Sequence, residues 1–211
     1  MDAIERLRSL VRMVVGQIAR AVNGASGGRI TPAQVTVASV LFHGLIVWAI
    51  IDSRLVLAGA MLIVFGLMDT LDGELARLQV KASHSGIVLD AAADRYKEGL
   101  IYAGLAVYFS ELNNTRLVFV CVLALSASFL VTFVKTKGEA VLAENSHAGD
   151  AQALNRRFGN ETFFRFEIRM TLLVVGLVTS WLSPILYLLA IGGLVSAILR
   201  YNEVDRRLKR L

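Results

Sequence analysis

Long apolar stretches constrain this chain more than any other feature. Six of them approach the ~20 residues that an α-helix needs to cross a bilayer. Hydrophobic residues make up 55% of the 211 residues, and the mean hydropathy is +0.60, well above that of an ordinary soluble domain. We therefore predict an all-α integral membrane protein with six transmembrane helices, at residues 33–51, 55–77, 88–112, 117–134, 170–181 and 185–199.

The positive charges predict how these helices are oriented. The short polar segments at residues 52–54, 111–116 and 180–184 carry only Arg54 and Arg116 as cations, and nearly all other Lys and Arg lie at the opposite helix ends. The positive-inside rule places that basic side, and both termini, in the cytoplasm. The net charge of +5 then reflects topology and attraction to anionic lipid headgroups, so no nucleic-acid partner is expected. Cys121, the single cysteine, lies in an apolar stretch and is expected to serve packing.

The segment before the first span has a different pattern. Residues 1–24 lack the continuous apolar block of a signal peptide. We expect an amphipathic helix at the membrane interface, with a break at residues 24–28 and a new helix capped by Thr31 with Pro32 in its first turn. The predicted domains are an amphipathic juxtamembrane helix and link at 1–28 and one membrane domain at 29–211. The apolar residues at helical spacing are Ile4, Leu7, Val11, Val14, Val15, Ile18 and Val22.

Four aspartates lie where the second and third spans approach the cytoplasm. Asp69 and Asp72 are spaced i, i+3, and Asp90 and Asp94 are spaced i, i+4, so each pair shares one helical face. Asp69 lies 15 residues after Arg54, or about 22 Å into a hydrocarbon core ~30 Å thick. The intervals from Arg54 to Asp72 and from Asp94 to Leu112 are both 18 residues, which predicts that Asp72 and Asp94 lie level on antiparallel helices.

Positive charge must compensate these aspartates, because each charged Asp at bilayer depth costs at least ~2.5 to 3.5 kcal/mol. One interpretation is a set of salt bridges to Arg77, Lys81, Arg95 or Lys97. The other is a pair of divalent cations, Mg²⁺ or Mn²⁺, which prefer oxygen ligands and suit phosphoryl transfer. The nearby small residues are consistent either with a ligand approaching the backbone or with close helix packing; they are Gly73, Ala76 and Gly86.

The segment resembles the signature of the CDP-alcohol phosphotransferase (CDP-alcohol phosphatidyltransferase) family. It is written Asp69-x2-Asp72-Gly73-x2-Ala76-Arg77-x8-Gly86-x3-Asp90-x3-Asp94. The resemblance implies a phospholipid biosynthesis transferase that moves a phosphatidyl-type group from a CDP-lipid, such as CDP-diacylglycerol, to a hydroxyl and releases CMP. It also implies a homodimer in the cell membrane, with the active site facing the cytoplasm.

The resemblance further assigns roles to individual residues. It implies that Asp69, Asp72 and Asp90 bind two divalent cations, and that Asp94 completes this site and acts as the catalytic base for the acceptor hydroxyl. The residues implied to bind the cytidine diphosphate are Pro32, Thr36, Asp69, Gly73, Ala76, Arg77 and Gly86. Pro32 and Thr36 are included because ITPAQVT resembles the family's Pro-x-x-Val-Thr element at the start of the first span.

Four cations at the cytoplasmic helix ends are candidates for binding an acceptor's phosphate: Lys135, Lys137, Arg169 and Arg200. The positive-inside rule and snorkelling explain such residues equally well. The sequence FVKTKGEA, however, resembles the Tyr-x-Lys-x-Arg-x-Glu-Ala element of the prokaryotic phosphatidylinositol-phosphate synthase branch, which favours inositol phosphate as acceptor. Phe133 and Lys137 depart from that element, and Lys lacks the bidentate fork of Arg. Glycerol 3-phosphate is the alternative acceptor.

Two other functions use similar residues. Intramembrane prenyltransferases also combine Asp-rich helices with Mg²⁺ and a lipid diphosphate, but usually have more helices and two separated Asp-rich motifs. A divalent cation transporter would place carboxylates near the midplane with access from both sides. The four aspartates here cluster toward one face, and no inverted repeat is visible in the sequence.

Overall fold

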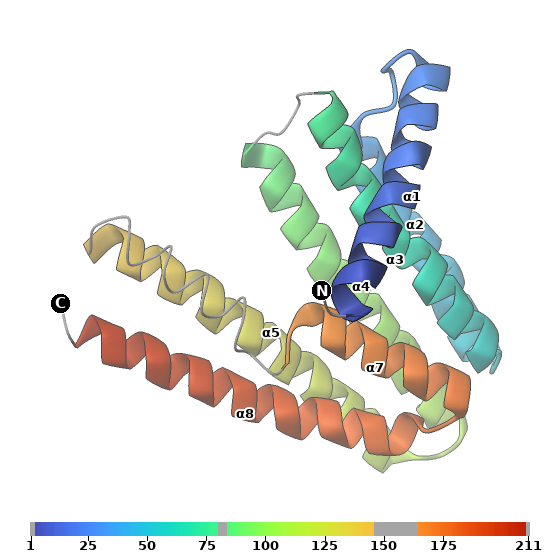
Figure 1. Cartoon of the computed structure of the whole chain (residues 1–211). Coiled ribbons are helices and arrows are strands. Elements are labelled where there is room, and N and C mark those ends of the chain that lie inside the picture. Colours follow the sequence, from blue (N-terminus) through green and yellow to red (C-terminus); the bar gives the residue numbers. More distant parts are fainter. Residues whose placement is uncertain (1–2, 80–83, 146–163, 210–211) are drawn as a thin grey trace. The chain divides into compact units, whose positions relative to one another are not determined.

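The computed structural model describes residues 3–79, 84–145 and 164–209, with side chains from residue 13 onward, and every regular element in these ranges is an α-helix (Figure 1). This confirms the all-α prediction for the described part of the chain. The chain divides into two compact units, Met1–Gly104 and Leu105–Leu211.

The first unit contains α1 (Ala3–Ser26), α2 (Pro32–Ile51), α3 (Leu55–Leu78) and most of α4 (His84–Glu111). The break predicted after residue 24 is present, because Gly27 and Gly28 have φ of 57° and 74°, a conformation that glycine adopts readily. The α2 start is also as predicted, with Pro32 in its first turn and a capping box between Thr31 and Gln34.

The amphipathic helix α1 uses part of its apolar face inside the protein. Ala19 is fully buried in a cluster with Val35 of α2 and Leu75 of α3. Burying a side chain such as Leu75 contributes about 1.5–3 kcal/mol relative to exposing it. Val14 and Ile18 remain about half exposed. The helix that the sequence predicts is therefore confirmed, with one apolar strip packed on α3 and another left open.

Two contacts fix the end of α3 in the same unit. The Gln79 side-chain nitrogen donates to Asn23 Oδ1 at 2.9 Å and to the carbonyl oxygen of Ile30 at 2.8 Å. It thereby connects α3 to α1 and to the segment that leads into α2.

At the other end of the unit, a Cβ at Gly104 of α4 would lie 3.2 Å from Val47 Cγ1 of α2, so the small residue permits this close approach.

The second unit contains α5 (Thr115–Asn145), α7 (Phe166–Thr179) and α8 (Leu182–Leu208). Figure 1 shows α5 and α8 side by side and running in the same direction. Glycines allow this contact: a Cβ at Gly138 would lie 2.5 Å from Val204 Cγ2, and one at Gly193 would lie 2.9 Å from Ala127 Cβ. The α7 helix turns back into α8 through Ser180, which has a φ of 61°.

The α5 and α8 helices extend well beyond the predicted spans. The predicted spans end at residues 134 and 199, whereas the helices end at Asn145 and Leu208. Charged residues end a membrane span but do not end a helix, and ion pairs at i, i+4 support the extension of α8. These pairs join Glu203 to Arg207 at 2.9 Å and Asp205 to Lys209 at 2.7 Å.

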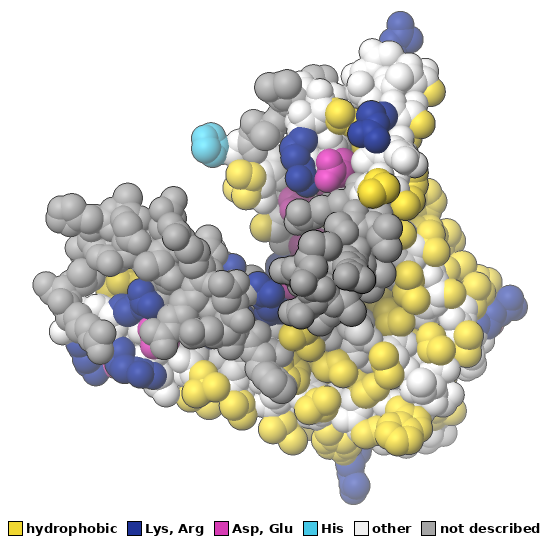
Figure 2. Space-filling view, viewed as in Figure 1, with side chains coloured by type: hydrophobic (Ala, Val, Ile, Leu, Met, Phe, Trp, Pro, Cys, Tyr) yellow, Lys and Arg dark blue, Asp and Glu magenta, His cyan; other side chains and the backbone are white. Residues whose placement is uncertain are grey.

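The surface is that of a multi-pass membrane protein. Four described helices, α2, α3, α5 and α8, are long and apolar enough to cross a bilayer. Large apolar side chains are exposed along them, and Figure 2 shows such side chains covering broad areas of the visible face. The α7 helix has only 14 residues, and α4 carries charges near its start. The predicted crossings at residues 88–112 and 170–181 therefore stay predictions.

Candidate active site

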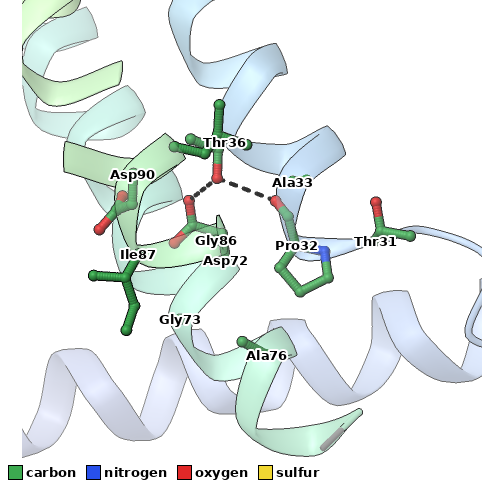
Figure 3. A pocket seen from close by; sticks show the side chains of 11 residues that line it. Thr31, Pro32, Ala33, Thr36, Asp72, Gly73, Ala76, Gly86, Ile87 and Asp90 are labelled. Carbon is green, nitrogen blue, oxygen red and sulfur yellow. Dashed lines mark hydrogen bonds between the residues drawn. The ribbon is translucent and has the colours of Figure 1, made fainter. Parts of the chain in front are cut away.

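Asp72 is held from α2 by Thr36. Its side chain lies near the end of α3 and is buried, with the residue 6% exposed. Thr36 Oγ1 lies 2.7 Å from Asp72 Oδ2 and 3.2 Å from the carbonyl oxygen of Pro32, as Figure 3 shows. A hydroxyl has a single proton, and the shorter contact to a carboxylate is the stronger hydrogen bond. The sequence placed both residues in one site, and the structure brings them together.

Asp69 lies one turn earlier on α3 and has two partners. Ser39 of α2 donates to Asp69 Oδ1 at 3.2 Å. Lys97 of α4 donates to the same oxygen at 2.5 Å. Ser39 and Lys97 are both buried, so this carboxylate is fixed from α2 and from α4.

Lys97 also contacts Asp94, with 3.0 Å between Nζ and Oδ1. Asp69 and Asp94 therefore lie on either side of one ammonium group, while Asp72 and Asp90 line a common cavity. Lys97 thus links Asp94 to Asp69 of α3, and the expectation that Asp72 lies level with Asp94 stays a prediction.

The four aspartates, named here the carboxylate cluster, interact electrostatically with one another across α3 and α4. The salt-bridge interpretation holds for one of the cations considered, Lys97. Arg77 pairs instead with Glu74 at 3.2 Å, and Arg95 pairs with Glu98 at 2.8 Å. Lys81 lies outside the described residues.

A cavity of about 570 Å³ opens beside Asp72 and Asp90, between the start of α2, the end of α3 and the start of α4 (Figure 3). Five of the seven predicted nucleotide-binding residues line it, namely Pro32, Thr36, Gly73, Ala76 and Gly86. Thr31, Ala33, Ile87 and Leu89 complete the lining. The cavity is therefore mostly apolar, with carboxylates at one side, as is common for small-molecule sites.

The other two predicted nucleotide-binding residues lie differently. Asp69 is next to the cavity residues on α3 but faces Ser39 and Lys97. The Arg77 side chain is largely exposed, and its Nε donates to the carbonyl oxygen of Gly73 at 3.3 Å. Arg77 does not line the cavity in this conformation.

The donor chemistry of the carboxylate cluster fits hard divalent cations, since all its side-chain donors are carboxylate oxygens. Within the described ranges, no three His, Cys, Asp or Glu side chains are arranged to hold a metal ion as they stand. Like charges repel, and the Lys97 ammonium already lies between two of the carboxylates. If the four carboxylates moved closer together, a cation with more charge than the lysine ammonium group would be needed to offset their repulsion.

All four predicted acceptor-binding cations belong to the second unit. Arg169 and Arg200 are both buried and interact electrostatically with each other. Arg200 also interacts electrostatically with Arg165 and Glu139. Lys135 lies 3.9 Å from Glu139 at its closest approach, whereas Lys137 is exposed. Arginine presents a planar fork of N–H donors that matches phosphate oxygens, so these residues are candidates for binding a phosphate.

The comparison with protein families decides what kind of protein this is. The sequence pattern describing the CDP-alcohol phosphatidyltransferases matches residues 29–199. The chain belongs to the CDP-alcohol phosphatidyltransferase family. The resemblance inferred from the aspartate motif is thereby confirmed, and this CDP-alcohol phosphatidyltransferase is an enzyme of phospholipid biosynthesis by its family.

Two curated relatives are each similar to about half of this chain. The chain is 34% identical over 114 residues to the bifunctional IPC transferase and DIPP synthase of Rubrobacter xylanophilus, and 30% identical over 115 residues to the phosphatidylinositol phosphate synthase of Corynebacterium glutamicum. These matches cover 54% and 53% of this chain, and they span only 25% and 52% of the two relatives.

The fold is that of a solved enzyme. Phosphatidylinositol phosphate synthase of Mycobacterium tuberculosis with CDP-DAG bound matches with a TM-score of 0.77 at 22% identity, over 91% of this chain and 94% of that one. A structure of the same enzyme in complex with manganese and citrate matches with a TM-score of 0.76 at 22% identity, covering 90% and 88%.

Several residues around these sites were not assigned from the sequence. Lys97 was considered only as a possible salt-bridge partner, although its i+3 spacing from Asp94 is a visible signal. Glu139 lies within FVKTKGEA but received no role. Ser39 and Gln79 carry no local signal, because their partners lie 30 or more residues away in sequence.

Proposed function

We propose that this enzyme transfers a phosphatidyl or related lipid phosphate group from a CDP-lipid to a small polar acceptor and releases CMP. The observation that carries the proposal is the joint placement of Asp72, Asp90, Gly73 and Gly86 on one cavity, directly beside Asp69 and Asp94. Family membership supports the reaction class.

We assign the carboxylate cluster to two divalent cations, Mg²⁺ or Mn²⁺. When bound, such ions supply Lewis-acid stabilisation of the diphosphate and of the leaving oxygen. Thr36 and Ser39 orient Asp72 and Asp69 by donating hydrogen bonds. Asp94 is proposed as the base that accepts the proton of the acceptor hydroxyl as that oxygen attacks phosphorus.

The cavity of the first unit is proposed to hold the cytidine diphosphate. Its volume, about 570 Å³, lies within the ordinary range for small-molecule sites. Gly73, Ala76 and Gly86 allow a ligand close to the helix backbone, and the solved relative with CDP-DAG bound supports a CDP-lipid donor. Arg77 is proposed to exchange its contacts with Glu74 and Gly73 for the nucleotide when it binds, because its side chain is largely exposed.

We propose six transmembrane helices in the cell membrane, with both termini and the active site on the cytoplasmic side. In this arrangement α4 and α7 cross the membrane in addition to the four long apolar helices. The segment at 1–28 lies at the interface and residues 29–211 form the membrane domain. A homodimer is proposed from the family resemblance.

Inositol phosphate is the proposed acceptor. The basic residues Lys135, Arg169 and Arg200 provide phosphate-binding charge in the second unit, and Lys137 can join them by rotating its long side chain. Relatives named phosphatidylinositol phosphate synthase support this choice. Glycerol 3-phosphate carries the same phosphate chemistry and is the alternative.

The test is CMP release by the purified chain given CDP-diacylglycerol and Mg²⁺ or Mn²⁺. Inositol phosphate, glycerol 3-phosphate, free inositol and serine are supplied one at a time. We expect release with inositol phosphate that is abolished in Asp72→Asn. CMP release with glycerol 3-phosphate as the only active acceptor would support the proposed transfer reaction and show that inositol phosphate is not the acceptor. No release with any acceptor, in folded protein, would refute the proposed reaction.

A further inference from the structure

The ammonium group of Lys97 lies inside the carboxylate cluster. Its Nζ is 2.5 Å from Asp69 Oδ1 and 3.0 Å from Asp94 Oδ1, and the residue is only 2% exposed. Lys97 comes from α4, so it links its own helix at Asp94 to α3 at Asp69. A buried lysine between two carboxylates is a strong constraint, because withdrawing it would leave uncompensated charge on both sides.

The cluster needs such a cation whenever no metal is bound. Asp69 interacts electrostatically with Asp72, Asp90 and Asp94, and all these charges have the same sign. Two neighbouring arginines contribute less, since Arg77 pairs with Glu74 and Arg95 pairs with Glu98. Lys97 is therefore well placed to offset the repulsion between α3 and α4 in the metal-free protein.

The position of this ammonium group overlaps with that of a metal. Magnesium binds carboxylate oxygens at about 2.0–2.1 Å, so an ion held by both Asp69 and Asp94 would lie in the space that Nζ fills. Two cations cannot share that space, because they would overlap and repel each other. The four-carbon stem of lysine allows the ammonium group to withdraw without movement of the α4 backbone.

We propose that Lys97 is an internal counter-cation of the carboxylate cluster, which a divalent cation displaces from Asp69 and Asp94 when it binds. The inference rests on the proposed function, in which these carboxylates hold metal. Lys97 stabilises the metal-free protein and at the same time weakens its affinity for metal. It is a positioning residue, and it sets the metal concentration at which the site is occupied.

The experiment is Mn²⁺ binding to the purified full chain by calorimetry, together with thermal unfolding in the absence and presence of Mn²⁺. Lys97→Gln removes the charge but keeps N–H donors for the carboxylates, and Lys97→Met removes both. The matched control is Lys209→Met, since Lys209 pairs with Asp205 at the exposed end of α8.

We expect both Lys97 variants to bind Mn²⁺ more tightly, with Kd lower by on the order of tenfold, because the competing charge is gone. Their metal-free forms should melt at lower temperature than wild type, and saturating Mn²⁺ should narrow this gap. Lys209→Met should match wild type in both measurements. An unchanged or weaker affinity in folded Lys97→Gln would overturn the proposal.

A second measurement needs no variant. In wild type, Mn²⁺ should increase the labelling of Lys97 by an amine-reactive reagent, because the displaced ammonium group leaves its buried position. Unchanged labelling at saturating Mn²⁺ would contradict displacement. Suppose that Lys97→Gln binds Mn²⁺ more tightly but wild type releases no CMP. That result would support displacement of Lys97 by metal and would refute only the proposed transfer reaction. Absence of Mn²⁺ binding in wild type would refute both.

Discussion

Thr36 connects two elements of the candidate active site, since its hydroxyl on α2 contacts Asp72 on α3. A carboxylate that binds metal depends on such a partner for its orientation, and losing the partner typically costs 10- to 100-fold in metal affinity or activity. At the residue scale, the site therefore extends beyond the aspartates themselves.

Thr36→Val tests this contact, because valine keeps the shape and removes the hydroxyl. We expect CMP release, or Mn²⁺ affinity, to fall by roughly 10- to 100-fold. Thr179→Val is the control, since Thr179 is exposed on α7 and its hydroxyl donates to the carbonyl oxygen of Val175. Equal activity of Thr36→Val and Thr179→Val would show that the Thr36 hydrogen bond does not orient Asp72.

Asp94→Asn separates the two roles proposed for Asp94. Asparagine keeps an oxygen for metal but cannot accept the hydroxyl proton, so turnover should fall by about 10²- to 10⁴-fold while Mn²⁺ still binds. Calorimetry and CMP release on the same preparation make this comparison. If metal binding and turnover are lost together, Asp94 is a ligand and its role as base is not supported.

The sequence could single out these residues because they share local spacing. Asp69, Asp72, Asp90 and Asp94 lie at helical intervals, and Thr36 was found through a resemblance at the start of α2. Ser39 could not be found in this way, because its contact with Asp69 depends on how α2 packs against α3.

At the scale of elements, glycines determine how closely α5 and α8 approach. Gly138 lies within FVKTKGEA, where the sequence drew attention to the lysines, yet its structural role is to admit Val204 of α8. This packing holds the segments of α5 and α8 that carry Lys135 and Arg200 against each other, as the hydrogen bond from Arg200 to the carbonyl oxygen of Val131 also shows.

Gly138→Ala should destabilise the protein despite the better helix propensity of alanine. The new methyl would lie 2.5 Å from Val204 Cγ2, and overpacking of this kind typically costs 1–3 kcal/mol. Gly66→Ala is the control, because nothing lies within 4 Å of its added Cβ and alanine gains up to ~1 kcal/mol in a helix.

Thermal unfolding in detergent measures the loss of stability in Gly138→Ala. Adding Val204→Ala to Gly138→Ala should restore much of the lost stability by making room for the methyl. A Gly138→Ala protein as stable as wild type would show that α8 can shift away from α5 at little cost.

Gln79 has a comparable role in the first unit, where it ties α3 to Asn23 and Ile30 beside the start of α2. We expect Gln79→Leu to weaken binding of CMP by several-fold, since Thr31 and Pro32 line the cavity and lose this support. Direct CMP binding measures it. Unchanged CMP affinity would mean that the capping box of α2 is enough to position Thr31 and Pro32 without Gln79.

The element boundaries were predictable to within a few residues where apolar stretches end at turns, as at residues 51 and 55. They were not predictable at the ends of α5 and α8, because hydropathy reports the bilayer boundary and the helix continues past it. The close packing at Gly138 was missed for a further reason: a single glycine within a helix carries no signal of its partner.

At the scale of the whole molecule, the chain is a multi-pass membrane protein that carries the carboxylate cluster on mostly apolar helices. Composition and the long apolar stretches were sufficient to predict this class. They were not sufficient to predict how the carboxylate cluster is neutralised, because that depends on Lys97 reaching both Asp69 and Asp94.

The most direct test of the account is metal-dependent CMP release from CDP-diacylglycerol with inositol phosphate, measured after chelation and again after Mn²⁺ is restored. The account predicts no release from the chelated enzyme, recovery with Mn²⁺, and no recovery in Asp72→Asn. Release that persists without metal, or that recovers equally in Asp72→Asn, would contradict the assignment of the carboxylate cluster as the metal-binding active site.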